Sequence, residues 1–330
     1  MSRVLVTGAT GGLGLAVAEA LAAEGFDVRA TGRNRSVAGR LQALRGEFVA
    51  ADLNDPTALP GLVKDIDGII HCAALSSPWG RYDDFYRINV VATRALLAAA
   101  RSAGVRRFVF VSSPSVYARP IDQEDLRESD APNPRPMNAY AATKGMAERE
   151  VLAQAGQGMA CVAIRPRAII GPDDTVVLPR VLRLVGRGRF PLLRGGQGLI
   201  EPTDSRDAAS ALMAALKRAE AVDGEVFNIS GGRCMTIKAM VERLASELEV
   251  RLKFIPLPYR AVAVAASAME AVCTVLPGQP EPPVTPYTLT TLAFSQTFNL
   301  TKARAGLDYQ PRFDAFETAL RVARERRHAG

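Results

Sequence analysis

The chain has 330 residues, of which 48% are hydrophobic and 23% charged, a composition typical of a globular protein with a large core. Its formal net charge is +7, which raises the question of nucleic acid. The basic residues are scattered singly along the chain, most of them are Arg, and aromatic residues make up only 6%. A nucleic-acid surface needs clustered cations or aromatic stacking platforms, so we expect no nucleic-acid partner.

Histidine and cysteine usage excludes several catalytic classes. The only histidines are His71 and His328, so neither a His-based metal site nor a Ser–His–Asp triad is expected, and we predict no metal. The cysteines are far apart and form no C-x-x-C pair, which indicates small buried side chains in a reducing compartment and predicts a cytoplasmic location. These cysteines are Cys72, Cys161, Cys234 and Cys273.

No targeting or membrane-spanning segment is expected. The N-terminus runs directly into a predicted strand, without a signal-peptide pattern. The most apolar late stretch, Ala261–Leu276, is interrupted by Glu270 and is short for a membrane span. We therefore predict a packed helix there.

In chain order, the first half alternates short apolar runs with Ala-rich helical patterns. The expected strands are Arg3–Thr7, Asp27–Thr31, Glu47–Ala50, Gly68–His71 and Arg107–Ser112. The expected helices are Leu13–Glu24, Val37–Arg45, Pro56–Lys64 and Asp83–Ala103. The strands are too apolar for a sheet wetted on one face, so the alternation predicts an α/β fold with a doubly wound parallel sheet. Ligands of such sheets bind along the edge where the strands end.

The second half is less regular. A helix at 136–154 and a strand Ala160–Arg165 follow, but Pro and Gly then cluster at 186–202 and 277–286. Residues 1–170 are expected to form the sheet domain, and 171–330 mainly a smaller substrate-binding domain. Residues 204–230 are expected to return to the sheet, because Glu225–Ile229 has the pattern of a further strand. Further helices are expected at 204–219, 236–248 and 314–327.

A glycine-rich turn joins the first strand to the first helix. Gly8 allows a tight turn, Gly11 lets backbone approach a pyrophosphate, and Gly14 permits close packing of helix on sheet. The helix N-terminus adds N–H donors and the positive end of the dipole. The position of the turn after the first strand predicts a dinucleotide site. Its contacts are expected from Gly8, Thr10, Gly11, Gly12, Leu13 and Gly14.

The end of the second strand bears on the choice of cofactor. An acid that binds the adenosine ribose is expected there, yet the position holds Gly32, with Arg33 and Arg35 following. Guanidinium groups pair with phosphate, so this end favours NADP, with NAD as the alternative. Both arginines could equally be ordinary solvated loop residues. Asp52-Leu53 after the third strand suits an adenine contact, although Asp at a strand end is also a common cap.

Tyr140 and Lys144 form a Y-x-x-x-K pair on a predicted helix. An i,i+4 spacing puts the phenol and the ammonium on one face, where a cation favours phenolate and so eases proton exchange. Alone, the pattern is also that of a surface pair. Ser113 ends the fifth strand and is expected to hydrogen-bond the substrate oxygen beside Tyr140. Ser115 is its rival, and alignment by strand end favours Ser113.

At this point the chain resembles the extended short-chain dehydrogenase/reductase superfamily, which has a Rossmann fold, and the resemblance covers almost the whole sequence. It is carried by the order and spacing of segments rather than by any one of them. These are TGATGGLG (7–14), Asp52-Leu53, His71–Ala74, Ile88–Thr93, FVFVSSPSVY (108–117), YAATK (140–144), Arg165-Pro166, Gly171-Pro172 and Phe227–Ser230.

The resemblance implies further site residues. Asn89 would support the proton relay to Lys144, although Ala92 stands where the family has Gly. Helices at 83–103 and 136–154 would form a homodimer interface, although their apolar residues could equally pack internally. Residues placed beside the cofactor are Ala73, Ala74 and Pro166.

Two segments look like the 3β-hydroxysteroid dehydrogenase branch, which includes bacterial 2-alkyl-3-oxoalkanoate reductases. One combines Ser77–Gly80 with Ser113–Val116, and the other runs from Pro282 through Thr297–Lys302 to Tyr309. The chain departs from that branch in lacking the acid through which its steroid enzymes prefer NAD. It also lacks the membrane segments of the eukaryotic members.

The second half offers two kinds of substrate contact. Trp79, Phe190 and the helix at 261–276 provide an apolar lining, although any one of them could be core. The alternative is a nucleotide sugar, whose pyrophosphate could be held by arginines of the second half. These arginines are Arg180, Arg183, Arg187, Arg194 and Arg206. We expect hydride transfer between the cofactor and a bulky hydrophobic ketone or alcohol, such as a 3β-hydroxysteroid-like or 3-oxoacyl lipid compound. The alternatives are a nucleotide-sugar epimerase or dehydratase and a non-catalytic NADP-binding regulator.

Overall fold

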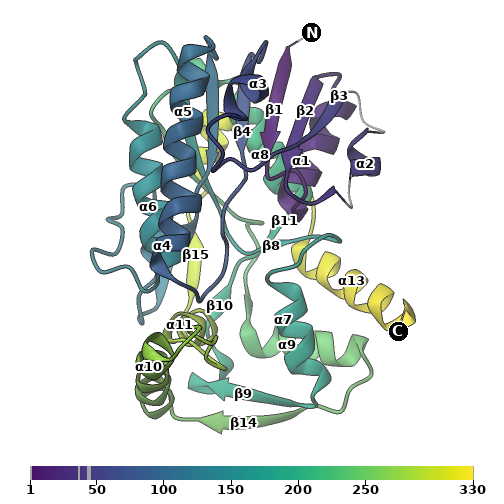
Figure 1. Ribbon diagram of the computed structural model, residues 1–330. Coiled ribbons are helices and arrows are strands. Elements are labelled where there is room, and N and C mark those ends of the chain that lie inside the picture. Colours follow the sequence, from purple (N-terminus) through teal and green to yellow (C-terminus); the bar gives the residue numbers. More distant parts are fainter. Residues whose placement is uncertain (1, 36–37, 43–45, 330) are drawn as a thin grey trace.

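A seven-stranded sheet forms the upper half of the computed structural model (Figure 1), which describes residues 2–35, 38–42 and 46–329. The strand order is β12-β7-β5-β4-β1-β2-β3, and every neighbouring pair is parallel. This is the doubly wound topology predicted from the sequence. The strands are β1 Arg3–Thr7, β2 Asp27–Gly32, β3 Gly46–Ala50, β4 Gly68–His71, β5 Arg107–Val111, β7 Ala160–Pro166 and β12 Val226–Ile229.

Helices cover both faces of this sheet, and alternate residues of one strand show why. Val4 and Val6 belong to the core cluster with α1 (Gly12–Ala23) and α8 (Ser205–Lys217). Leu5, between them, packs in the cluster formed on the other face, because successive side chains of a strand point to opposite faces. The helices of that face are α3 Leu59–Val63, α5 Ala92–Ser102 and α6 Ala139–Leu152.

Each predicted strand and helix has a counterpart in the structure, although the bounds differ by up to a few residues and one helix is divided. The helix expected at Val37–Arg45 contains α2 (Ala38–Gln42), while 36–37 and 43–45 lie outside the described residues. The helix expected at Asp83–Ala103 is divided into α4 (Tyr82–Phe85), the π-helical η2 (Tyr86–Val91) and α5. A π turn is a local widening that leaves no period in the sequence, so the 3.6-residue pattern could not reveal it.

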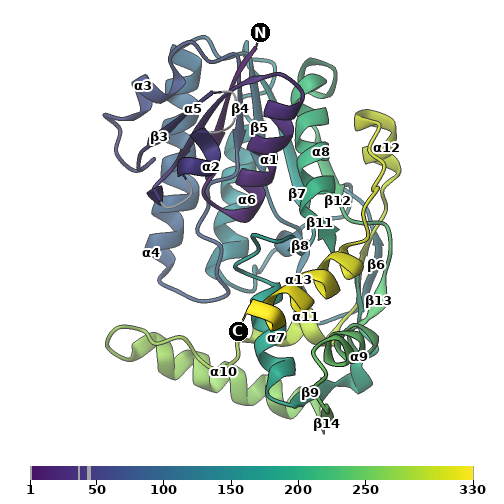
Figure 2. The same cartoon turned by 90° about the vertical axis from the view of Figure 1, so that its right-hand side faces the viewer.

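The strand predicted at Glu225–Ile229 is the edge strand β12, which pairs with β7. Most of the rest of the chain builds a smaller region below the carboxyl ends of the strands (Figures 1 and 2). In that region β6, from the first half, joins β15, β10 and β13 in a four-stranded sheet. The division at residue 170 remains a prediction. The elements of this region are β6 Gln123–Leu126, β8 Ile169–Ile170, α7 Leu178–Gly186, β9 Arg189–Leu193, β10 Leu199–Ile200, β11 Thr203–Asp204, β13 Met235–Thr236, α9 Ile237–Glu247, β14 Lys253–Leu257, α10 Tyr259–Val275, α11 Pro286–Ala293, β15 Gln296–Phe298 and α13 Ala315–Ala329. The helix α12 (Thr301–Leu307) instead packs beside α8 and β12 at the level of the large sheet (Figure 2).

The helix predicted at 261–276 is α10, which projects from the lower region (Figure 2). It packs through Ala266 and Cys273, whereas Val264 and Val275 are 71% and 81% exposed. Among the residues that the structure describes, no helix combines the length and the apolar character needed to cross a membrane.

A buried ion pair fastens α6 to the sheet. Arg165 in β7 donates from Nε to Glu148 Oε2 in α6 at 2.8 Å, and its Nη2 bonds Glu148 Oε1. Its Nη1 bonds the hydroxyl of Tyr117, which ends the short helix η3 (Pro114–Tyr117). All three side chains are buried, so the two charges are compensated within this group and not by water.

Removing one partner of this pair should strongly destabilise the fold. We expect Glu148→Gln to lower the free energy of unfolding by about 3–5 kcal/mol, because Arg165 is then left charged and buried. Urea denaturation measures the change. The control is Glu150→Gln on the same helix, which breaks the exposed pair Arg94–Glu150 and should change stability by less than about 1 kcal/mol. Equal effects would contradict the interpretation.

Candidate active site

The glycine-rich turn has the geometry expected of a dinucleotide cradle. Gly8 has φ +65°, and a Cβ there would lie 2.7 Å from the Ala73 backbone. A Cβ at Gly14 would overlap the Gly8 carbonyl oxygen. Both positions therefore need glycine for a close backbone approach. Gly12 is confined differently, since its Cβ would lie 2.6 Å from the Asp173 carbonyl oxygen, which brings a loop of the second half against the turn.

The N-terminus of α1 is free to bind an anion. Gly11 at the N-cap is extended and offers no side-chain cap, and the first turn carries no acid. The first N–H groups of a helix lack intrahelical acceptors, so those of Gly12, Leu13 and Gly14 can serve a pyrophosphate. A Cβ at Gly11 would meet nothing nearer than 3.5 Å, which leaves room beside the turn. These features fit a nicotinamide dinucleotide.

The part of the dinucleotide site expected to hold the adenosine contains two exposed arginines and one acid. Arg33 and Arg35 follow β2 and are exposed. Asp52 Oδ1 accepts from the backbone N–H of Asn54 at 3.0 Å and from its side chain at 2.8 Å. These hydrogen bonds, and more weakly Arg33, hold the pKa of Asp52 below its usual value. Leu53 beside it is half-buried.

The space next to Gly32 is already filled. A Cβ at Gly32 would lie 2.6 Å from the Thr10 side chain. An acid at this position would therefore require the Thr10 side chain to move.

His71, at the end of β4, is a neutral brace rather than an acid–base group. Its Nδ1 lies 2.6 Å from Thr7 Oγ1 and its Nε2 lies 2.9 Å from Thr93 Oγ1. Burial, with Lys144 nearby, lowers its pKa to about 3. Thr7 also accepts from the N–H of Ala73 at 3.2 Å, which fixes the start of the half-buried segment containing Ala74.

Tyr140 meets two serine hydroxyls. The side chains of Ser113 and Ser76 lie close enough to its phenol to act on the pKa of Tyr140. The rival Ser115 has a buried hydroxyl without a partner in the described part of the chain, and its N–H donates to Ser113 Oγ at 3.1 Å. The geometry thus places Ser113, and not Ser115, beside the phenol. Ser76 lies in a loop without a spacing signal, so the sequence alone does not identify it as a site residue.

Lys144 is buried on the same helix as Tyr140. Its Nζ lies 4.0 Å from the centroid of the Phe110 ring, and burial lowers its pKa to about 7. The pKa of Tyr140 is raised by burial, and the two serines only partly offset this. The expectation that Lys144 holds the phenol pKa down is therefore wrong for this state of the protein, because burial penalises both charges.

Asn89 lies in the π-helical segment η2. Its Oδ1 accepts from the N–H of Leu75 at 2.7 Å, and its Nδ2 donates to Thr143 Oγ1 at 3.1 Å. Thr143 stands between Tyr140 and Lys144 in α6, so Asn89 ties that helix to the loop after β4. π-helical turns are frequent at functional sites.

A cavity of about 410 Å³ adjoins the start of α6, with Trp79, Phe85, Asn138, Ala139 and Glu270 among its lining residues. Trp79 Nε1 donates to the carbonyl of Gln279 at 2.9 Å, which links the loop after β4 to the segment following α10.

Phe190 is not part of this lining. It is 1% exposed and packs in the core of the second half, edge-on to Phe254 at 6.5 Å. The predicted substrate contact at Phe190 is corrected to a packing role, because its side chain is buried in the core cluster that β9 forms with α7, α9 and α13.

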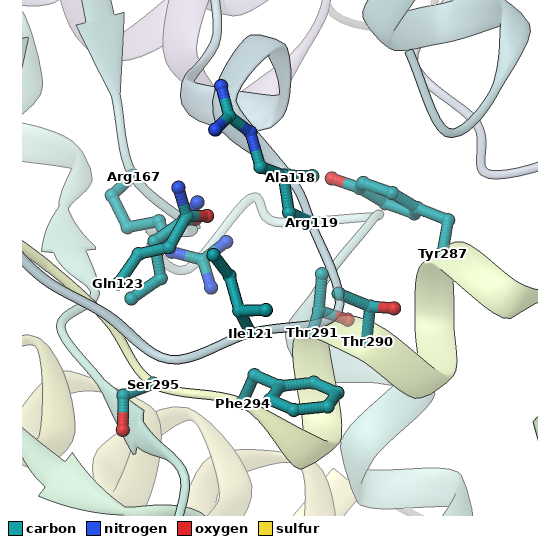
Figure 3. Close-up of a pocket in the computed structure, with 11 residues that line it drawn as sticks. Ala118, Arg119, Ile121, Gln123, Arg167, Tyr287, Thr290, Thr291, Phe294 and Ser295 are labelled. Carbon is teal, nitrogen blue, oxygen red and sulfur yellow. The ribbon is translucent and has the colours of Figure 1, made fainter. Parts of the chain in front are cut away.

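A second, narrow pocket contains Arg167 and Tyr287 (Figure 3). Arg167 follows Pro166, which is buried at the end of β7, so alignment by strand end could have identified it. Tyr287 lies in α11, far along the chain. The pKa of Tyr287 is raised by burial to about 12, with Arg167 and Tyr140 both acting on it, and only the folded chain brings these groups together.

Comparisons with known proteins agree with this geometry. The model of the NAD dependent epimerase/dehydratase family matches residues 4–230. YbjS of Escherichia coli, an uncharacterized protein, is 35% identical over 94% of this chain and 93% of its own. The 4-hydroxy-2-methyl-3-oxo-4-farnesyl-3,4-dihydroquinoline-1-oxide ketoreductase of Stigmatella aurantiaca is 33% identical, over 94% and 92%. The 2-alkyl-3-oxoalkanoate reductase of Stenotrophomonas maltophilia is 31% identical, over 97% and 98%.

Solved structures share the fold. MoeE5 in complex with UDP-glucose and NAD is 24% identical, with a TM-score of 0.77 over the full length of both chains. RMD from Pseudomonas aeruginosa, complexed with NADPH, is 20% identical, with a TM-score of 0.73, also over both full lengths. These neighbours bind NAD or NADPH.

Because the pKa of Lys144 lies near 7, the amine of the free protein is largely neutral at pH 8. Ribose hydroxyls and phosphates favour its charged form, so dinucleotide binding at pH 8 should take up as much as about one proton. Calorimetric titration in two buffers of different ionisation enthalpy measures this uptake, and Lys144→Met should abolish it. Wild-type heats that do not depend on the buffer would contradict the assignment.

Proposed function

The chain belongs to the NAD dependent epimerase/dehydratase family and is an NAD(P)-dependent oxidoreductase, and on that premise we propose that it interconverts a ketone and a secondary alcohol on a bulky hydrophobic substrate. The observation that carries the proposal is the meeting of Tyr140 with Ser113, one helical turn from the buried Lys144. Two relatives are named as reductases of oxo compounds, which supports the reaction type.

The chemistry divides between cofactor and protein. The nicotinamide supplies or accepts the hydride when bound. Tyr140 gives or takes the proton at the substrate oxygen, and Ser113 donates a hydrogen bond to that oxygen as negative charge develops on it. Lys144 has a pKa near 7, so it can carry a proton to the site at neutral pH, while Asn89 positions the helix through Thr143.

The size of the cavity and two of its aromatic side chains support a hydrophobic substrate. The cavity has a volume of about 410 Å³, large enough for a ring system or an acyl chain, and Trp79 and Phe85 line it. The lining also includes the charged side chains of Arg81, Asp83 and Glu270.

The arginines that a nucleotide sugar would need are largely engaged by acids. Arg194 pairs with Asp122 and Arg206 with Asp204, both at 2.8 Å. Arg180 lies 3.6 Å from Glu281. A guanidinium already paired with a carboxylate is a poor site for a pyrophosphate, so the pairing favours the hydrophobic ketone over the nucleotide sugar.

For the cofactor we propose NADP, because β2 ends in Gly32 rather than in an acid and because Arg33 and Arg35, which follow it, are exposed. The homodimer through the helices predicted at 83–103 and 136–154 and the cytoplasmic location likewise remain predictions. On the first of these helices Val91 is an exposed apolar side chain.

The NADP preference is tested by fluorescence titration with NADPH and NADH. We expect tighter binding of NADPH, and we expect Arg33→Asp to weaken NADPH by about 10-fold or more while affecting NADH little, because only the 2′-phosphate loses its cation. Arg183→Asp, an exposed change in α7, is the control. Equal affinity of the wild type for both cofactors would overturn the proposal and favour an NAD enzyme.

The catalytic assignment is tested with Tyr140→Phe. We expect turnover of a hydrophobic cyclic ketone to fall by about 10²–10⁴-fold, with cofactor affinity unchanged, since only the proton donor is lost. UDP-glucose is assayed in parallel for epimerisation. Retained activity in Tyr140→Phe would refute the role of the phenol. Epimerisation without ketone reduction would replace the proposed substrate, and cofactor binding with no turnover of either substrate would favour a regulator.

A further inference from the structure

A broad exposed face of α10 consists of apolar side chains. The helix has 17 residues and packs on its core cluster through Ala266 and Cys273. With 3.6 residues per turn, the exposed apolar positions gather on the opposite side over the whole length of the helix. A continuous apolar patch that faces water marks an interaction site. The patch includes Val264, Ala265, Ala268, Met269, Val272 and Val275.

This apolar face carries no acid. The one acid of α10 is Glu270, which is half-buried and lines the wide cavity together with Thr274. The helical period places Glu270 on the side opposite to the apolar face. Residues 250–269, which include β14 and most of α10, contain neither Asp nor Glu. No negative charge of this segment would therefore repel an anionic partner.

Unpaired cations flank the apolar face. Lys253 and Arg189 are register partners in β14 and β9, and both are exposed. Arg251, before β14, and Arg260, in the first turn of α10, are exposed as well. None of these side chains has an ion-pair partner within the described residues. Their positive charge is thus available to a partner molecule.

The alternation of β14 turns its cation toward the same side as α10. Phe254 packs against the core of the second half, so Lys253, Ile255 and Leu257 point to the other face. Leu257 packs in the cluster that α10 joins, whereas Ile255 is 37% exposed. The exposed side of β14 therefore continues into α10, and β9, β14 and α10 lie together at the bottom of the molecule (Figures 1 and 2).

Other exposed arginines of the same region are paired with acids. Arg243 of α9 lies 2.5 Å from Glu317 of α13, and Arg324 of α13 lies 2.7 Å from Glu247 of α9. The surface of α9 and α13 is therefore neutralised internally, while the surface around α10 combines an apolar face with free positive charge.

We propose that this surface, formed by the apolar face of α10 and the cations of β9 and β14, docks on an anionic lipid bilayer. Apolar side chains enter the boundary between head groups and acyl chains, and flanking cations are attracted to the lipid phosphates. Because Glu270 and Thr274 line the wide cavity from the opposite side of α10, about one helix diameter, roughly 10 Å, separates that cavity from the lipid.

A second copy of the chain fits this surface less well. In a two-fold contact the same patch meets itself. The cations at Arg189, Lys253 and Arg260 would then approach their own copies with no acid of the segment to neutralise them. An anionic bilayer supplies both the apolar phase and the negative charge.

The test is sedimentation of the full-length protein with lipid vesicles. One set consists of phosphatidylcholine alone, and the other of equal parts phosphatidylcholine and phosphatidylglycerol. We expect the wild type to bind the anionic vesicles on the order of 10-fold more tightly, and the difference to shrink as salt is raised. Val272→Asp should weaken binding to the anionic vesicles by about 10-fold or more. Val91→Asp, which changes an exposed valine outside this surface, is the control.

The cations are tested separately with Lys253→Glu. We expect binding to the anionic vesicles to weaken by about 5-fold or more, and binding to phosphatidylcholine to change little. Arg304→Glu, an exposed change in α12, should leave both unchanged. Because Val272 is 55% exposed, Val272→Asp should unfold at the same temperature as the wild type, so that its loss of binding reports the surface and not the fold.

The remaining outcomes decide against the proposal. Equal affinity for both kinds of vesicle, or binding to neither, would overturn it. Dimerisation seen without lipid by sedimentation velocity, abolished by Val272→Asp in a protein that ignores vesicles, would assign the surface to a second copy.

The inference stands apart from the proposed reaction. Tyr140→Phe should bind vesicles as the wild type does, since Tyr140 lies in α6. Vesicle binding by a protein that reduces no ketone would keep the docking surface and refute the reaction. Ketone reduction without vesicle binding would do the reverse.

Discussion

The arrangement of the candidate active site depends on the buried ion pair between Arg165 and Glu148. It joins the strand that ends at Pro166 to the helix that carries Tyr140 and Lys144. Through Tyr117 it also reaches the turn after β5, where Ser113 lies. In a low-dielectric interior, the loss of either charge leaves the other unpaired at a large cost in stability. The pair therefore fixes the relative positions of β7, α6 and the turn after β5, which all contribute site residues.

The same interior leaves other polar groups unsatisfied where ligands are expected. Burial shifts Lys144 toward its neutral form, and it is not paired as Arg165 is. The start of α1 similarly exposes N–H groups without acceptors. Polar groups left unsatisfied in the active site lower the stability of the ligand-free fold. A bound anion or hydroxyl can supply the missing hydrogen-bond or charge partner for each of them.

The features that could be predicted from the sequence are those that depend on residues close together in the chain. The apolar strands, the glycine turn and the Tyr140–Lys144 spacing each depend on residues that are neighbours in sequence, and Ser113 follows from the rule that parallel strands end at one edge. Contacts across the fold had no such signal. Trp79 meets Gln279, and Asn89 reaches α6 through a π-helical turn, because of tertiary packing alone.

The sequence by itself determined the doubly wound sheet, the place of the dinucleotide turn and the face of the helix that presents Tyr140, since periodicity and spacing encode these within short segments. Only the tertiary structure decided which side chains surround them. It placed Phe190 in the core, paired Arg194 and Arg206 with acids, and left the buried Nε of Arg167 without a hydrogen-bond partner among the described residues. The physical reason is that burial and pairing depend on residues up to hundreds of positions apart, which no local pattern specifies.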